Sequence, residues 1–221
     1  MLLGELARQR QQTCVYLQSE LMGGALQRFT FQEGQLIPLP AQQLLSNLLT
    51  IDDYLRIHLP GYKVEGFHRT ESGQLSSGGL FEQAVFQALQ EGCDEVLAGV
   101  RPAGVANQIE IDLVIRCGNQ VGIAEIKLGG GDSGKRGLDQ LKMAGEPTYL
   151  GTYTRQFLIV AQKRLRPSIA ILARERNVQV ICLPDYQEGQ PSLPPTDAEY
   201  LRQFVRQALG ADLTAPQATP Q

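Results

Sequence analysis

Three charged residues stand in two neighbouring apolar stretches of the sequence: Asp112 in the first, Glu125 and Lys127 in the second. Apolar runs of this length predict strands, and the Gly-Asn pair between them predicts a hairpin turn. Because side chains alternate along a strand, Glu125 and Lys127 are expected on the same face. The hairpin then brings all three charged side chains together on one side of a sheet.

Two converging carboxylates form an oxygen-rich site, which hard cations such as Mg²⁺ or Mn²⁺ prefer. A lysine two positions after the second acid projects the same way, where it can orient a water molecule or stabilise charge on a phosphate oxygen. The alternative is a solvated hairpin face with Glu and Lys paired across the strands. Both strands are otherwise strongly apolar, as in a sheet covered on both faces, where an unpaired carboxylate is costly. That context favours the chemical interpretation.

Strand alternation also predicts which side chains of the first stretch face the core. It places two acids on one face and four apolar residues on the other. The acids are Glu110 and Asp112, and the apolar residues are Ile109, Ile111, Leu113 and Ile115.

A third carboxylate, Glu82, lies near the start of a predicted helix. Glu82, Phe86 and Leu89 are spaced as i, i+4 and i+7, so the glutamate shares the apolar face of that helix. A glutamate there also complements the helix dipole, which is the simpler interpretation. If the apolar face packs on the sheet, Glu82 completes an acidic pocket.

The elements that must position these residues follow an αβββαβαβ order, which predicts an α/β fold with a mixed central sheet flanked by helices. An amphipathic helix follows a proline-rich stretch at the end. The predicted helices cover 79–91, 134–145, 167–176 and 197–209, and the predicted strands cover 94–100, 108–116, 120–128, 156–161 and 178–183.

The amino-terminal part predicts a separate small α+β appendage. A Gly- and Ser-rich stretch at 60–78 indicates a linker, so the boundary is expected near residue 70, with the main domain over 71–210 and a disordered tail over 211–221. Within residues 1–70 we expect helices at 4–12, 41–49 and 51–58, and short strands at 13–17, 25–31 and 35–39.

Three short motifs then occur in order: Gly-Gly-Leu-Phe-Glu ending at Glu82, Glu-Ile-Asp-Leu around Asp112, and Ala-Glu-Ile-Lys ending at Lys127. In this order and on these elements, they resemble the PD-(D/E)XK, or restriction-endonuclease-like, nuclease superfamily. More narrowly, they resemble the carboxy-terminal nuclease domain of CRISPR-associated ancillary nucleases that cyclic oligoadenylates activate. The resemblance spans about residues 75–185.

The resemblance implies a metal-dependent phosphodiesterase that acts on DNA or RNA with Mg²⁺ or Mn²⁺. It makes Asp112 and Glu125 metal ligands, with the Ile126 carbonyl between them in the metal shell. It makes Lys127 the lysine that assists water or phosphate, and Glu82 matches the acidic residue of the first helix. All of these roles are expectations from the family.

The superfamily often adds a polar residue from the helix after the Glu-x-Lys strand, and Gln140 stands at that place, with Lys142 as a comparable candidate. Two features depart from the family. The residues before 71 are too few for the nucleotide-sensing domain of the activated nucleases, so no cyclic-nucleotide site is expected. Ile111 stands where the name-giving proline would precede Asp112.

Basic residues cluster between Arg155 and Arg176, where six stand against one acid. They are candidates for phosphate contacts, and a solvated helix face is the alternative. The Gly-rich loop at 129–136 is basic at its far end but lacks the spacing of a P-loop. The candidate nucleic-acid-binding residues are Lys135, Arg136, Lys142, Arg155, Lys163, Arg164 and Arg166.

Composition excludes several function classes. A net charge of −3 excludes a uniformly basic nucleic-acid coat, and the four cysteines include no CxxC pair that would indicate a zinc site. His58 and His68 have no partner at ligand spacing. The amino terminus lacks a secretory signal and no apolar run approaches about 18 residues, so a cytoplasmic protein with no membrane contact is expected.

Together these patterns predict a metal-dependent nuclease, endonucleolytic and homodimeric, because cutting both strands calls for two active sites. Two alternatives stay open. One is a non-catalytic nucleic-acid-binding protein that keeps the fold, and the other is a subunit that an activating protein partner must switch on. The choice between DNA and RNA is also open.

Overall fold

The computed structural model divides the 221-residue chain into two compact units, Met1–Leu48 and Leu49–Gln221. The division falls earlier than the boundary near residue 70 expected from the sequence. The structure describes the backbone of 14–20, 23–32 and 35–38, and the backbone and side chains of 50–103, 109–129, 131–146, 149–150 and 154–210.

The first unit contains a three-stranded antiparallel sheet in the order β1-β2-β3. These strands lie where the sequence predicts short strands at 13–17, 25–31 and 35–39. The strands are β1 (Cys14–Glu20), β2 (Gly23–Gln32) and β3 (Gln35–Pro38). The helices predicted at 4–12 and 41–49 and the tail at 211–221 lie outside the described residues.

The second unit is built on a six-stranded sheet in the order β4-β5-β6-β7-β8-β9. The strands from β4 to β7 pair antiparallel, whereas β7, β8 and β9 pair in parallel. The sheet is therefore mixed, as predicted. Its strands are β4 (Lys63–Val64), β5 (Glu95–Arg101), β6 (Ile111–Cys117), β7 (Gln120–Lys127), β8 (Arg155–Val160) and β9 (Val178–Cys182).

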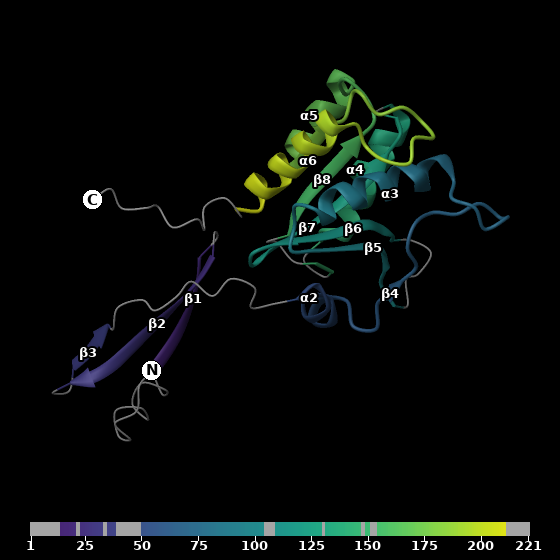
Figure 1. The fold of residues 1–221 in the computed structure, drawn as a ribbon. Helices are drawn as coiled ribbons and strands as arrows, with labels where there is room; N and C mark the ends of the chain where they lie inside the picture. The colour runs from purple at the N-terminus through teal and green to yellow at the C-terminus, as the bar shows by residue number, and fades with distance from the viewer. Residues whose placement is uncertain are drawn as a thin grey trace. The chain divides into compact units, whose positions relative to one another are not determined.

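Helices cover both faces of this sheet (Figure 1). One face packs against α3 (Ser77–Gln90) and α6 (Pro195–Ala208), and the other against α2 (Ile51–His58), α4 (Asp132–Ala144) and α5 (Pro167–Glu175). This mixed α/β sheet flanked by helices is the architecture that the sequence predicts. None of the described helices is long and apolar enough to cross a membrane.

The two faces of the sheet bury separate hydrophobic cores. Phe81 and Phe157 lie in the core under α3 and α6, and Leu55 and Leu158 lie in the core under α2, α4 and α5, all fully buried. A sheet buried on both faces needs apolar side chains at every position, which explains the nearly continuous apolar runs of β6, β7 and β8.

The prediction that Ile111 and Leu113 share a face is wrong. Ile111 lies in the α2, α4 and α5 core, whereas Leu113 lies in the core on the other face. Side-chain alternation in the neighbouring strand β5 is interrupted at the same position. Gly99 of β5 adopts φ +65°, and the β5–β6 ladder lacks a Gly99–Asp112 pair. A left-handed glycine interrupts the pleat, so alternation fails beyond it.

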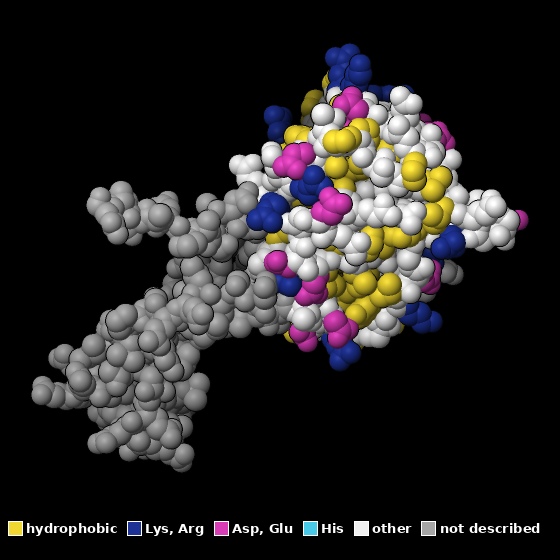
Figure 2. Space-filling model, viewed as in Figure 1, with side chains coloured by type: hydrophobic (Ala, Val, Ile, Leu, Met, Phe, Trp, Pro, Cys, Tyr) yellow, Lys and Arg dark blue, Asp and Glu magenta, His cyan; other side chains and the backbone are white. Residues whose placement is uncertain are grey.

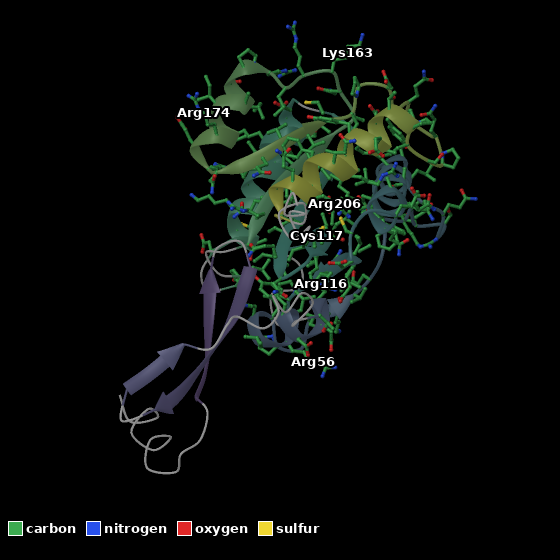
Figure 3. The ribbon with its side chains drawn as sticks, turned by 60° about the vertical axis from the view of Figure 1, so that its left-hand side comes forward. Arg56, Arg116, Cys117, Lys163, Arg174 and Arg206 are labelled. Atoms are coloured by element: carbon green, nitrogen blue, oxygen red, sulfur yellow. The ribbon has the colours of Figure 1, made fainter. Side chains whose placement is uncertain are left out.

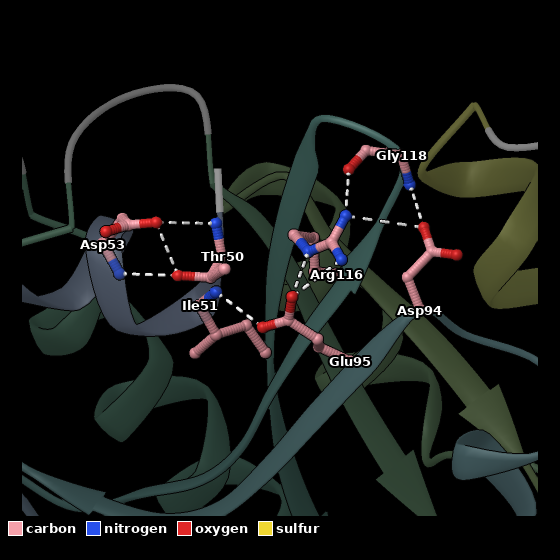
Figure 4. Close-up of polar contacts among 7 residues, drawn as sticks. All are labelled: Thr50, Ile51, Asp53, Asp94, Glu95, Arg116 and Gly118. Atoms are coloured by element: carbon pink, nitrogen blue, oxygen red, sulfur yellow. Dashed lines mark hydrogen bonds and ion pairs between the residues drawn. The ribbon is translucent and has the colours of Figure 1, made fainter. Parts of the chain in front are cut away.

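Helix α2 is attached to the sheet through its first turn (Figure 4). Thr50 and Asp53 form a reciprocal capping box. The Ile51 amide donates to Glu95 Oε2 over 2.7 Å, and the other oxygen of Glu95 accepts from the Arg116 guanidinium. Arg116 is 5% exposed, so one buried arginine ties α2 to the sheet.

The segment 60–78, expected to be a linker, is part of the second unit. β4 extends the sheet by pairing with β5, and the chain then passes over the first turn of α3. A Cβ at Gly79 would lie 2.1 Å from the His68 carbonyl oxygen, and one at Gly99 would lie 2.0 Å from that of Gly66. Only glycine at these two positions lets the segment lie so close.

Candidate functional site

The acidic residue of β6 reaches β7 where the two strands separate. Their ladder ends at the pair of Leu113 and Ala124. One step further, Asp112 Oδ2 accepts a 2.7 Å hydrogen bond from the Ile126 amide, which no longer has a backbone partner on β6. The carboxylate therefore takes the place of a backbone carbonyl at the point where the ladder opens.

Lys127 joins the two strand carboxylates, as the hairpin predicted. Its Nζ lies 3.5 Å from Asp112 Oδ2 and contacts Glu125 Oε1. Glu125 is 1% exposed, and the side chains of Asp112 and Lys127 are 9% and 21% exposed. The structure thus brings these three predicted residues together in a buried cluster that retains an opening at the lysine.

Glu82 approaches the same cluster from α3, a helix on the face of the sheet opposite to α4. Ser76 caps this helix by accepting a 3.0 Å hydrogen bond from the Gly79 amide. Glu82 is half-buried in the second turn, and its Oε2 accepts from the His68 amide over 3.1 Å. Its carboxylate is close enough to interact electrostatically with Asp112 and Lys127.

The protonation equilibria of the cluster show that it lacks positive charge. Burial raises the pKa of Glu125 well above its usual value, and the neighbouring Asp112 carboxylate adds to the effect. Burial also raises the pKa of Asp112, against the opposing effect of Lys127. Burial and then the Asp112 charge raise the pKa of Glu82 to about 7.

The pKa of Lys127 is raised despite its burial, because the carboxylates of Asp112 and Glu125 outweigh the cost of desolvation. A lysine with a raised pKa stays protonated at neutral pH. One ammonium group therefore faces three carboxylates, and these acids repel one another in a site with little solvent to screen them.

Helix α4 covers the cluster at a glycine. A Cβ at Gly137 would lie 2.9 Å from Leu158 Cδ1, 3.1 Å from Glu125 Cγ and 3.6 Å from Lys127 Cγ. Gly137 therefore lets the helix backbone lie directly on the two side chains. The role of Gly137 was not predicted from the sequence, although glycines inside a predicted helix are a signal of close approach, because glycine weakens helices.

No hydrogen bond links the buried Oε1 of Gln140 to the acidic cluster. Gln140 lies on α4 one turn after Gly137, and its Oε1 is buried without a hydrogen-bond partner. Lys142, the comparable candidate on the same helix, is exposed.

The donor set fits a hard divalent cation. Within the described ranges, no three Asp, Glu, His or Cys side chains stand close enough together to hold a metal ion. Two carboxylates and the Ile126 carbonyl remain as donors. The Lys127 carbonyl points toward β8, where it accepts a hydrogen bond from the Ala161 amide. Because carbonyls alternate in direction along a strand, the Ile126 carbonyl points the other way, toward Asp112. Oxygen donors and a surplus of buried negative charge are what Mg²⁺ or Mn²⁺ requires.

The candidate basic residues lie at different places on the second unit. Lys135, Arg136 and Lys142 are exposed on α4, and Lys163, Arg164 and Arg166 are exposed between β8 and α5. Arg166 lies against the loop after β7, since a Cβ at Gly131 would lie 3.2 Å from its guanidinium.

Arg155 stands apart from the other basic candidates. It pairs in register with Gly122, while Leu158 pairs with Glu125, so Arg155 is three residues from the level of the glutamate. That is roughly 10 Å along a strand. The structure does not bring Arg155 to the acidic cluster.

Comparisons with known proteins support the fold and do not test the function. No family model and no curated protein sequence matches the chain. Among solved structures, Can2 from Sulfobacillus thermosulfidooxidans in complex with cyclic tetra-adenylate superposes with a TM-score of 0.56 at 12% identity, over 94% of this chain and 72% of that one. Protein VC1899 from Vibrio cholerae superposes with a TM-score of 0.52 at 14% identity, over the same shares.

A third structure, an EndoMS complex with double-stranded DNA, has a TM-score of 0.39 at 11% identity, over 80% of this chain and 66% of that one, too low to add to the argument. At 12% and 14% identity, the first two likenesses show the fold alone, which agrees with the mixed α/β fold expected from the sequence. The matched share of this chain exceeds the stretch 75–185 on which the sequence motifs rest.

Proposed function

We propose that this chain is a divalent-metal-dependent nuclease that cuts phosphodiester bonds within DNA or RNA. The observation that carries the proposal is the buried cluster of Asp112, Glu125 and Lys127, with a surplus of negative charge. An ordinary solvated hairpin face does not bury a glutamate to 1% exposure beside a second carboxylate. Such an arrangement is costly to fold and is typical of functional sites.

Asp112 and Glu125 would hold Mg²⁺ or Mn²⁺ together with the Ile126 carbonyl. When bound, the cation supplies a Lewis acid that polarises the phosphate and lowers the pKa of coordinated water. Glu82, whose pKa is raised to about 7, changes charge near neutral pH and would complete the acidic pocket.

Lys127 would act as a fixed positive charge. Its pKa is raised, so it remains an ammonium group and cannot serve as a base at neutral pH. It can orient the attacking water and stabilise the negative charge that develops on phosphate oxygens. Hydrolysis forms a bond between the water oxygen and phosphorus and breaks the bond to the leaving sugar oxygen, which takes up a proton.

Substrate binding would depend on local cations. On the face drawn in Figure 2, Lys and Arg side chains are interspersed with Asp and Glu, so that face offers no continuous basic surface. The exposed basic residues around the loop after β8 and on α4 are the candidates for phosphate contacts. These residues are Lys135, Arg136, Lys142, Lys163, Arg164 and Arg166.

The direct test is cleavage of circular single-stranded DNA, supercoiled plasmid and structured RNA with Mg²⁺ or Mn²⁺. Wild type is compared with Glu125→Ala and Lys127→Ala, and with the matched exposed variants Glu188→Ala and Lys63→Ala. We expect metal-dependent cutting that the first two variants lose and the controls retain. Cutting of a circle establishes endonucleolytic action.

If wild type cuts nothing, calorimetric titration with Mn²⁺ separates the remaining explanations. Binding that Glu125→Ala abolishes indicates a silent nuclease that a protein partner must activate. One contact agrees with that alternative, since Lys127 bridges the carboxylates that would receive the cation. Absence of binding overturns the catalytic proposal.

We also propose that the active form is a homodimer, because cutting both strands of a duplex calls for two sites. Sedimentation velocity with and without nucleic acid tests this point. A monomer in both conditions that still linearises a plasmid contradicts it.

A further inference from the structure

The outer edge of β9 borders a hollow of 540 Å³ on the second unit. β9 is the last strand of the sheet, and no described strand pairs with its outer side. Four consecutive residues, Asn177 to Val180, line the hollow. Because side chains alternate between the two faces of a strand, this run shows that the hollow lies along the edge of β9. Backbone N–H and C=O groups at such an edge are available to a ligand.

The charge of this hollow, hereafter the β9 groove, is entirely positive. Lys163, Arg164 and Arg174 contribute to its wall, and the described residues that line it include no acid and no aromatic side chain. Lys163 precedes α5 and Arg174 lies in the last turn of that helix, and in Figure 3 both side chains point outward and lie well apart. The nine residues of α5, about 13 Å long, begin after Lys163 and Arg164 and contain Arg174 in their last turn.

The β9 groove opens on the same face of the sheet as the acidic cluster. Lys127, Val160 and Cys182 are register partners on three adjacent strands, and Cys182 lines the groove. Two strand spacings amount to roughly 10 Å. Glu125 and Lys127 share their face of β7 with Ile123, and Cys182 packs against the same core. A single strand of nucleic acid bound at the acidic cluster can therefore reach the β9 groove within a few nucleotides, along the end of the sheet where Lys127, Val160 and Cys182 lie.

We propose that the β9 groove binds one strand of the nucleic acid through its phosphates. This inference rests on the proposed nuclease function and names the form of substrate that the site takes. A hollow of 540 Å³ is the size of a pocket for a small molecule, which matches about one or two nucleotides of a single strand. Without aromatic side chains the bases have no stacking platform, so binding is independent of sequence and comes from phosphate contacts.

Binding is measured by fluorescence anisotropy with a short labelled single-stranded DNA, and with RNA of the same sequence, in a chelating buffer that prevents cutting. The triple variant Lys163→Ala, Arg164→Ala and Arg174→Ala is compared with wild type. The control removes three exposed cations from the β4 side of the unit: Arg56→Ala, Lys63→Ala and Arg69→Ala. Both triple variants change the net charge equally.

For a single strand the logarithm of affinity falls with the logarithm of salt concentration, with a slope of about −0.7 per neutralised phosphate. Three phosphate contacts in the β9 groove therefore contribute about −2 to the slope. We expect the groove variant to lose this contribution and to bind at least about tenfold more weakly in low salt, while the control keeps its slope. Equal slopes and affinities in the two variants overturn the proposal.

Alkylation reports occupancy of the groove directly. Cys182 lines the β9 groove, whereas Cys93 lines a hollow beside β5, and both are half-buried thiols. We expect bound oligonucleotide to slow alkylation of Cys182 and not of Cys93, as read by peptide mass spectrometry. Equal protection of both thiols, or of neither, contradicts the assignment.

The outcomes separate this inference from the proposed function. Wild type that binds oligonucleotide through the groove but neither cuts nor binds Mn²⁺ retains the groove and overturns the catalysis. Wild type that cuts, with a groove variant that binds and cuts equally well, retains the nuclease and overturns the groove. Wild type that cuts nothing and binds neither oligonucleotide nor Mn²⁺ overturns both.

Discussion

The two ends of strand β6 both carry buried charge, and they neutralise it in opposite ways. At one end, Arg116 donates to Glu95 over 2.7 Å and to the Gly118 carbonyl over 2.6 Å, and lies 3.5 Å from Asp94. The carboxylates around it also accept backbone amides from Ile51 and Gly118. Every group of this arginine network has a partner of opposite polarity.

At the other end, Asp112 belongs to a cluster in which three carboxylates share one ammonium group. The pKa values of Asp112, Glu125 and Glu82 are all raised, which shows that ionising these acids costs free energy in the folded state. The arginine network is built for stability, whereas the acidic cluster gives up stability to keep acceptors ready for a cation.

The largest expected effect is on catalysis at the acidic cluster. Glu125→Gln and Asp112→Asn should each lower the rate of metal-dependent cleavage by at least about 10³-fold, because each removes a charge that the reaction requires. Neither should lower the free energy of unfolding measured in chelator, because each removes a repulsive charge. If a variant loses activity only because it unfolds, the acidic cluster contributes to stability as the arginine network does. The two ends of β6 would then not differ in this respect.

Removal of the arginine should produce the reverse result. Arg116→Met leaves the Glu95 carboxylate without its buried partner and should destabilise the protein by about 3 kcal/mol, measured by urea denaturation. Glu95 and Asp94 are partly exposed, which limits the loss. Well below the melting temperature, cleavage per folded molecule should stay within a few fold of wild type. A large loss of cleavage by folded Arg116→Met would show that the two ends are coupled.

The pH dependence of stability should report Glu82. Its pKa is raised from 4.5 to about 7, so the folded state binds a proton more tightly than the unfolded state, and its contribution to stability falls as pH rises through that window. Glu82→Gln removes the carboxylate and should gain up to roughly 3 kcal/mol relative to wild type near pH 8, and far less near pH 5. Chemical denaturation in chelator at the two pH values measures this difference.

A constant difference between Glu82→Gln and wild type at the two pH values would place the glutamate outside the electrostatic reach of the cluster. The surface variant Glu188→Gln serves as the control, and its stability should follow that of wild type across the range.

A smaller effect is expected at the helix that covers the cluster. Gly137→Ala adds a Cβ 2.9 Å from Leu158 and 3.1 Å from Glu125, so α4 or the glutamate must move by a few tenths of an ångström. We expect a loss of about 1–2 kcal/mol in stability, together with a fall in cleavage rate that exceeds what the loss of folded protein explains. Gly145→Ala, where the near atom belongs to the flexible Gln156 side chain, is the control, and its cleavage rate should not fall.

The sequence alone was sufficient to predict the parts of the site that depend on local pattern. Convergence of Asp112, Glu125 and Lys127 required only two apolar strands and a short turn. The mixed fold followed from the order of the elements, and the helix of Glu82 followed from its apolar spacing.

Parts that depend on backbone geometry were not predictable. The change of face at Gly99 and Asp112 comes from one left-handed glycine, which the apolar pattern of β6 does not reveal. Residues 60–78 looked like a linker because their glycines signal turns, yet Gly79 permits close packing. Gln140 was placed by family position, and its buried Oε1 faces no described partner.

The change of face at Asp112 divides β6 into two parts. Between these parts the alternation of side chains shifts by one residue. Residues before Asp112 point their apolar side chains toward α2, while Leu113 and Ile115 keep their register with β7. An insertion before Asp112 would therefore displace only the outer half, and the inner half would continue to hold the acid against the Ile126 amide. The approach to the acidic cluster can diverge in sequence and length while the cluster itself stays in place.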